Sequence, residues 1–300
     1  MTTQSEQTTQ TRQSTGLKRL DEMLGGGLIP GTLTVVLGAT GIGKTQLGIQ
    51  FADAGRTQEG ERGIFFDLTS RGDAQNHAEY AIRMYDWVFR ERSADDKPDL
   101  TKIWDRDLSR SDYLHVFRRT GRRVTLENLD RDQWQEWRVE FMKKIDQSIA
   151  FCYGNFVHGV RRCVIDGVEP VEKESDSFQF HVIDYLYHQI LRKDHDWVAR
   201  DLFRSKFRES EPQIEQHAYR YDQIGCLLLL TSHETMLDDL LSRRIETGDV
   251  LSNANTIIAM GKVRDGMQMK RGLHIAKHRG SDCDDAIVEF RIGEHGIELD

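Results

Sequence analysis

The stretch Gly38-Ala-Thr-Gly-Ile-Gly-Lys44-Thr45 matches the complete phosphate-binding pattern G-x-x-x-x-G-K-[ST]. The apolar, β-branched run Thr32-Leu-Thr-Val-Val-Leu37 stands before it and predicts a buried strand. Residues 46–54 follow with apolar side chains at helical spacing and stop at Gly55, so they predict a helix. This order wraps main-chain N–H groups and a helix N-terminus around phosphate oxygens. The stretch therefore predicts a site for a nucleoside triphosphate with Mg²⁺.

Each part of this loop has an expected task. Glycines let the backbone fold closely around the phosphates. Lys44 would reach the β- and γ-phosphates as a catalytic cation, and Thr45 would ligate the metal. The alternative is a glycine turn that holds no ligand. The residues expected to bind the nucleotide are Gly38, Ala39, Thr40, Gly41, Ile42, Gly43, Lys44, Thr45 and Gln46.

A second metal ligand is expected at Asp166. It ends the short apolar strand Arg161-Arg-Cys-Val-Ile-Asp166. An acid at this place holds Mg²⁺, usually through water, on the strand beside the phosphate loop. The alternative is an aspartate that caps the next turn.

Composition narrows the class of protein. The chain has 300 residues, 30% of them charged, and a net charge of −8, which argues against a general nucleic-acid coat protein. The longest apolar run, Cys226-Leu-Leu-Leu-Leu230, has the length of a strand and not of a membrane span. Residues 1–13 are polar and predict a disordered tail without the apolar core of a signal peptide. The four cysteines form no C-x-x-C pair, so we expect a cytoplasmic protein.

The order of elements predicts an α/β fold. Strands alternate with helices early in the chain, and strands dominate near its end. This order predicts a mostly parallel central sheet flanked by helices, with antiparallel edge strands near the C-terminus. Lys44 and Asp166 lie 122 positions apart, which exceeds the roughly 60 residues that two strand–helix units need, and we expect a helical insertion at residues 71–155 and a second one at residues 168–222. The predicted strands are residues 32–37, 63–68, 161–166, 225–231, 256–260, 272–276 and 286–292.

Five segments, in the right order, resemble the KaiC-like branch of the RecA/RadA ATPases. The resemblance implies a RecA-like P-loop NTPase domain over residues 14–300, with ATP and Mg²⁺ as ligands. It also implies a sensor position at Thr231 or Ser232, with His233-Glu234 near the γ-phosphate. The matching segments are residues 14–31, 163–166, 225–234, 252–258, and 275–281 together with 288–297.

The resemblance also implies self-assembly. In that family ATP lies between neighbouring subunits, and the matching residues Lys277 and Arg279 would point at the γ-phosphate held by an adjacent protomer. Two residues that lie two apart on a strand share a face, and cations there stabilise the charge of phosphoryl transfer. A head-to-tail contact of this kind implies a ring, hexamer-like, or a filament. The alternative is a solvated strand end.

One departure from the family pattern bears on the rate. The family carries two adjacent glutamates at the end of the second strand, where this chain has Thr69-Ser70. A hydroxyl is a poor general base near neutral pH. Asp67 and Asp73 are the possible substitutes. A smaller departure is Asn255, where an aspartate is usual. We therefore expect ATP binding and slow hydrolysis.

Three functions remain open from the sequence: a KaiC-like regulatory ATPase acting on protein partners through the insertions, a RadA-type DNA-recombination ATPase, and a nucleotide-gated scaffold. The basic cluster Arg118-Arg-Thr-Gly-Arg-Arg123 fits a contact to nucleic acid or a partner, but more simply a loop paired with nearby acids. DNA binding is not favoured, because the chain is acidic. Asp194-His-Asp196 lacks the spacing of metal ligands.

Overall fold

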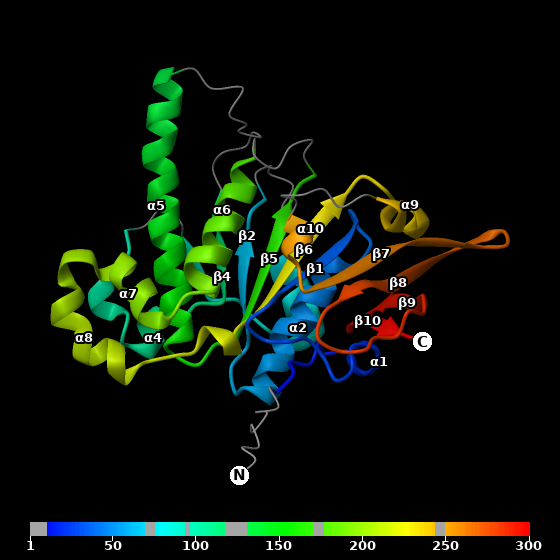
Figure 1. Ribbon diagram of the computed structural model, residues 1–300, viewed down its shortest axis with the longest axis horizontal. Coiled ribbons are helices and arrows are strands. Elements are labelled where there is room, and N and C mark those ends of the chain that lie inside the picture. Colours follow the sequence, from blue (N-terminus) through cyan, green and yellow to red (C-terminus); the bar gives the residue numbers. More distant parts are fainter. Residues whose placement is uncertain (1–10, 70–75, 94–96, 118–130, 171–176, 244–249) are drawn as a thin grey trace, which may run out of the picture.

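A single central sheet runs through the molecule in the computed structural model (Figure 1). The structure describes residues 11–69, 76–93, 97–117, 131–170, 177–243 and 250–300. Across the sheet the strand order is β10-β9-β8-β7-β1-β6-β5-β2-β4-β3. The strands are β1 (Leu33–Ala39), β2 (Ile64–Asp67), β3 (Glu91–Ser93), β4 (Tyr113–His115), β5 (Arg162–Val168), β6 (Gly225–Ser232), β7 (Thr256–Asp265), β8 (Gln268–His278), β9 (Val288–Gly293) and β10 (Gly296–Leu299).

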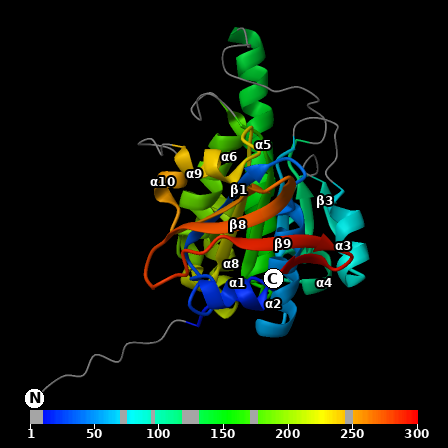
Figure 2. The same ribbon diagram turned by 90° about the vertical axis from the view of Figure 1, so that its right-hand side faces the viewer.

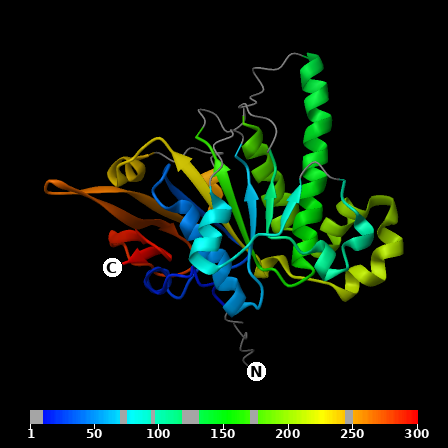
Figure 3. The same ribbon diagram turned by 180° about the vertical axis from the view of Figure 1, so that it is seen from behind.

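Helices cover both faces of this sheet. On one face lie α1, α2 and α3. Figure 3 shows the molecule from behind, and there α2 and α3 lie in front of the strands. On the other face lie α5, α6 and α7. The helices are α1 (Lys18–Met23), α2 (Lys44–Gln58), α3 (His77–Tyr85), α4 (Arg106–Ser109), α5 (Arg131–Phe156), α6 (Phe178–Leu186), α7 (His195–Phe203), α8 (Phe207–Gln216), α9 (Leu237–Ser242) and α10 (Val250–Asn253).

Alternation along the strands divides the core in two. Val36 and Phe65 pack towards α2, whereas their neighbours Val35 and Phe66 pack towards α5. Helices cover both faces of the inner strands, so side chains on both faces are apolar. The sequences of these strands are therefore continuous apolar runs. The three-layer arrangement leaves the carboxyl ends of the parallel strands as an uncovered edge where polar side chains collect.

The parallel and antiparallel parts lie where the sequence predicted them. β7, β1, β6, β5, β2, β4 and β3 are parallel, and β8, β9 and β10 extend the sheet as antiparallel strands. β8 and β9 lie towards the viewer in Figure 2, and β10 is the last strand on this side of the sheet. The fold is thus the predicted RecA-like α/β fold.

Residues 71–155, predicted as a helical insertion, contain two short strands in addition to helices. After α3 the chain adds β3 and β4, which continue the parallel sheet beyond β2. Each has three residues, too few for a period of two to show in the sequence. The amino-terminal half of α5 extends beyond the carboxyl ends of the strands (Figure 1). The described part of residues 168–222 contains α6, α7 and α8 after β5.

Gln13 belongs to the predicted tail, yet it is paired with the rest of the domain. Gln13 exchanges two backbone hydrogen bonds of 2.8 Å with Leu28, and its side-chain amide donates to the carbonyls of Arg161 and Gln223. Polar composition alone gave no sign of this pairing, because Gln13 is bound through its amides and not through apolar contact. Residues 1–10 lie outside the described part of the chain.

Candidate nucleotide-binding site

The glycine loop joins β1 to α2 at the carboxyl edge of the sheet. Gly41 has a φ of +75° and Gly43 a φ of +122°, both in the region that favours glycine. A Cβ on Gly41 would meet nothing within 4 Å, so that side of the loop is open, whereas a Cβ on Gly43 would lie 3.2 Å from Ile292 Cδ1. No side chain caps α2, and the first N–H groups of a helix have no acceptor inside it. The loop therefore fits an anion such as a phosphate.

Lys44 is buried at the base of the loop. Its Nζ donates hydrogen bonds to the carbonyl oxygens of Gly38, at 2.8 Å, and Ala39, at 3.0 Å. Burial lowers the pKa of Lys44 to about 8, and the charge of Asp166 opposes that shift only in part. The ammonium is thus held by neutral acceptors, and a phosphate would supply the negative charge that it lacks.

Thr45 and Asp166 meet across the site. Thr45 Oγ1, on the first turn of α2, donates to Asp166 Oδ2 at 2.8 Å, and the Asp166 carboxylate is 1% exposed. The predicted position of Asp166 needs one correction, since β5 does not lie beside β1. β6 lies between them, and it is the start of α2 that spans the gap. A hydroxyl and a carboxylate at this distance are oxygen donors of the kind that Mg²⁺ accepts.

A histidine that the sequence did not single out completes this arrangement. His77, the first residue of α3, is 1% exposed and lies between two carboxylates. Its Nε2 is 3.0 Å from Asp166 Oδ2, and its Nδ1 is 3.8 Å from Asp67 Oδ2. Asp67 and Asp166 are cross-strand neighbours on β2 and β5. We call Lys44, Thr45, Asp67, His77 and Asp166 the carboxyl-end cluster.

The electrostatic state of Asp166 follows from this cluster. Burial alone would raise the pKa of the Asp166 carboxyl, but the hydrogen bond and charge of His77 oppose burial, as do Lys44 and Thr45. Together they hold its pKa below the usual range. Asp166 is therefore an ionised carboxylate near neutral pH, which is the form that a metal needs.

Asp67 and Asp73 are the residues that the sequence offers in place of the family's glutamate pair. Asp67 accepts a hydrogen bond of 2.8 Å from the Thr69 amide, and it also accepts the hydroxyls of Thr69 and Tyr113. Burial first, and then the charge of Asp67, raises the pKa of Tyr113. These hydrogen bonds already occupy the Asp67 carboxylate as an acceptor, and the carboxylate is 2% exposed. Ser70 and Asp73 lie outside the described residues.

Comparison with known proteins agrees with this geometry. The family model described as the KaiC ATPase matches residues 13–104. The circadian clock oscillator protein KaiC of Acaryochloris marina is 32% identical over 295 residues, which are 98% of this chain and 43% of that protein. The KaiC of Thermostichus vulcanus is 42% identical over 62 residues, 21% of this chain and 12% of that protein. This chain belongs to the KaiC-like branch of the RecA-superfamily P-loop ATPases.

The chain matches only part of the length of each of these relatives. The circadian clock protein KaiC2 of Synechocystis is 32% identical over 94 residues, 31% of this chain and 16% of that protein. The KaiC-like chain thus aligns with less than half the length of each of these three relatives. Their printed names refer to the circadian clock, and that role belongs to those proteins.

The predicted sensor residues lie beside the loop of the KaiC-like chain. Thr231 and Ser232 on β6 pair in register with Gly38 and Ala39 on β1. The hydroxyl of Ser232 donates to the carboxylate of Glu234, and this hydrogen bond is the main cause that lowers the pKa of Glu234. The end of β6 therefore faces the same edge as the loop.

Lys277 and Arg279 lie elsewhere. Gly38 on β1 pairs with Met260 on β7, which pairs with Leu273 on β8. Lys277 lies four residues farther along this antiparallel strand, about 13 Å towards the opposite edge of the sheet. Its Nζ donates to the carbonyls of Leu251 and Ser252, at 3.2 and 3.1 Å. Within one chain, Lys277 and Arg279 therefore do not lie beside the glycine loop.

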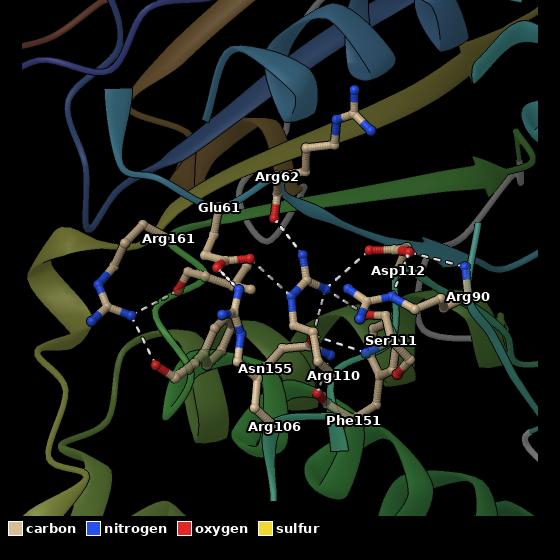
Figure 4. A network of polar contacts seen from close by, with 12 residues as sticks. Glu61, Arg62, Arg90, Arg106, Arg110, Ser111, Asp112, Phe151, Asn155 and Arg161 are labelled. Atoms are coloured by element: carbon tan, nitrogen blue, oxygen red, sulfur yellow. Dashed lines mark hydrogen bonds and ion pairs between the residues drawn. The ribbon is translucent and has the colours of Figure 1, made fainter. Parts of the chain in front are cut away.

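A second buried polar network lies at the amino ends of the strands (Figure 4). Arg110 donates to Asn155 Oδ1 at 2.8 Å and to the carbonyls of Ser111 and Arg62, both at 2.9 Å. It also forms ion pairs with Asp112, at 3.1 Å, and Glu61, at 3.4 Å. The network ties the segment before β4 to α5 and to the turn before β2. We call these six residues the Arg110 network: Arg110, Ser111, Asn155, Arg62, Asp112 and Glu61.

The other candidate residues add no site. His195 starts α7, and the described residues contain no group of three or more His, Cys, Asp or Glu side chains placed to hold a metal ion. The basic cluster at residues 118–123 lies outside the described ranges. Cys163 and Cys226 are buried free thiols. No described helix combines the length and the apolar character that crossing a bilayer requires.

Proposed function

We propose that this chain binds Mg²⁺·ATP at the carboxyl-end cluster as an oligomeric regulatory ATPase. The observation that carries the proposal is the 2.8 Å contact between Thr45 and Asp166 beside the buried Lys44. The loop amides and Lys44 would hold the phosphates, and Thr45 and Asp166 would hold the metal, Asp166 through water. The metal would neutralise charge on the β- and γ-phosphate oxygens.

Slow hydrolysis is the second part of the proposal. At the place of the family's glutamate pair, Thr69 turns its hydroxyl towards Asp67, and Asp67 is occupied by Thr69 and Tyr113. Neither group is therefore ready to take a proton from water. This observation also favours the scaffold alternative, in which ATP binds but is barely turned over. None of the described residues adds support for the DNA-recombination alternative.

Completion of the site by a neighbour is the third part. Arg279 is exposed, and its side chain makes no hydrogen bond or ion pair with the described residues. Lys277 lies on the same strand end. Both would reach a triphosphate only on an adjacent protomer, which supports head-to-tail assembly.

Phosphate release and light scattering test the proposal. We expect assembly that depends on ATP and steady-state turnover well below 1 s⁻¹, on the order of the lower limit of typical enzymes. Mixing the Lys44→Ala and Arg279→Ala variants should restore part of the turnover that each lacks alone, since each supplies the half that the other has lost. No gain on mixing, at concentrations where hybrids form, would contradict the neighbour contact.

A further inference from the structure

His77 contacts the metal side of the site from outside the phosphate loop. Among the described residues, three groups donate to the Asp166 carboxylate: the Thr45 hydroxyl and His77 Nε2 to Oδ2, and the Gly167 amide to Oδ1 at 2.7 Å. The Thr45 and Gly167 contacts come from the loop helix and from β5 itself. His77 is the member of the three that α3 supplies.

The ring of His77 is itself held in place. It packs edge-on against Phe65 with 5.9 Å between ring centroids, and it is tilted against Tyr113 at 5.5 Å. Asp67 lies on the Nδ1 side. A carboxylate only accepts hydrogen bonds, so the nitrogen that faces Asp166 must carry a hydrogen. The buried ring therefore presents a fixed donor to one oxygen of Asp166.

We propose that His77 is a positioning residue for the divalent cation: it fixes the orientation of the Asp166 carboxylate that receives the hydrated metal. This inference rests on the proposed function, because it needs Mg²⁺·ATP at this site. Partners that orient metal-binding side chains typically contribute about 10- to 100-fold to metal affinity. Asp67 acts one step farther out, on the far side of the ring, and through Tyr113 it joins the arrangement to β4.

The competing explanation is a core histidine that only supports the fold. The two explanations differ in what they do to Mg²⁺ dependence. A purely structural loss would weaken ATP binding with and without Mg²⁺ to the same degree. A lost positioning contact would reduce the gain in affinity that Mg²⁺ confers. The ratio of the two dissociation constants, with EDTA and with saturating Mg²⁺, therefore separates them.

The experiment measures this ratio with a fluorescent ATP analogue on the full chain. We expect His77→Ala and His77→Phe to reduce the ratio about tenfold or more relative to the unsubstituted chain. His77→Phe keeps a buried ring and serves if the alanine variant does not fold. His77→Gln can place an amide N–H where Nε2 lies, and it should stay within about threefold of the unsubstituted chain. His158→Ala, which removes a histidine bound to the Ile103 carbonyl, is the matched control and should leave the ratio unchanged.

Two results would overturn the inference. One is an unchanged ratio in the folded His77→Phe variant. The other is a His77→Gln variant that loses as much as His77→Phe, since the donor would then not be what matters. Failure of the proposed function looks different: the unsubstituted chain would then bind no ATP analogue, or bind it without regard to Mg²⁺.

Discussion

The carboxyl-end cluster and the Arg110 network place charged groups in the interior at opposite ends of the same strands. Arg110 has three hydrogen-bond acceptors and two carboxylates around it. Lys44 has two neutral carbonyls, and the glycine loop above it is open at Gly41. Arg110 is therefore paired with carboxylates of its own network, whereas the hydrogen bonds of Lys44 within the described residues go to neutral carbonyls. A buried charge that is fully paired serves the fold, and one that is incompletely paired points to a ligand.

The largest expected effect is on stability. Arg110→Ala should lower the free energy of unfolding by about 3–5 kcal/mol, because it removes the buried cation beside the buried carboxylate of Asp112, whose other cation, Arg90, is exposed. Urea unfolding followed by circular dichroism measures it. Arg106→Ala is the matched control, because Arg106 also pairs with Glu61 but is exposed, and it should cost less than about 1 kcal/mol. A loss below about 1 kcal/mol for Arg110→Ala would contradict the contrast between the two regions.

At Lys44 we expect a large effect on nucleotide binding and a small effect on stability. Lys44→Ala should weaken Mg²⁺·ATP binding by about 100-fold, or roughly 2.7 kcal/mol, since the phosphates lose a buried cation. Its unfolding free energy should change by less than about 1 kcal/mol, because a desolvated charge is removed together with its two neutral contacts. Equilibrium titration with a labelled nucleotide measures the binding. Lys270→Ala, at a half-buried lysine on β8 that pairs with Asp265, should bind as the unsubstituted chain does. Equal affinity in the Lys44 variant would contradict the site.

A smaller change is expected in the pH dependence of ATP affinity. The pKa of Lys44 is about 8 before nucleotide binds, and the phosphates would raise it, so binding takes up a proton once the free amine has lost it. ATP affinity should therefore be constant well below pH 8 and fall by up to about tenfold per pH unit above it. The terminal phosphate is already ionised in this range and adds no such slope. A Lys44→Met variant should show no slope. Affinity that rises with pH would contradict the assignment.

Sequence reasoning singled out the glycine loop and Asp166 in the carboxyl-end cluster, but it missed His77 and the whole of the Arg110 network. The glycine loop and Asp166 carry a local pattern with a known physical task, so position along the chain was enough. The position of β6 between β1 and β5 depends on how strands order themselves in the sheet, which no local pattern encodes. His77 escaped notice for a similar reason, because only the packing of α3 against β2 and β5 brings its ring between two aspartates.

The Arg110 network shows why charge alone misleads. Residues 93–112 are highly charged and lie within the predicted helical insertion. Arg110 is nevertheless 3% exposed, because the fork of its guanidinium finds acceptors from three separate segments. Such pairing requires residues distant in sequence, here Glu61 and Asn155, and a single sequence gives no indication of which acids will meet which base.

The most direct test of the central claim is calorimetric titration of the full chain with ATP, once with Mg²⁺ and once with EDTA. The account predicts one nucleotide per chain and an affinity that Mg²⁺ strengthens, with Thr45→Ala and Asp166→Asn each reducing that gain. No binding at millimolar ATP, or equal affinity with and without Mg²⁺, would contradict it.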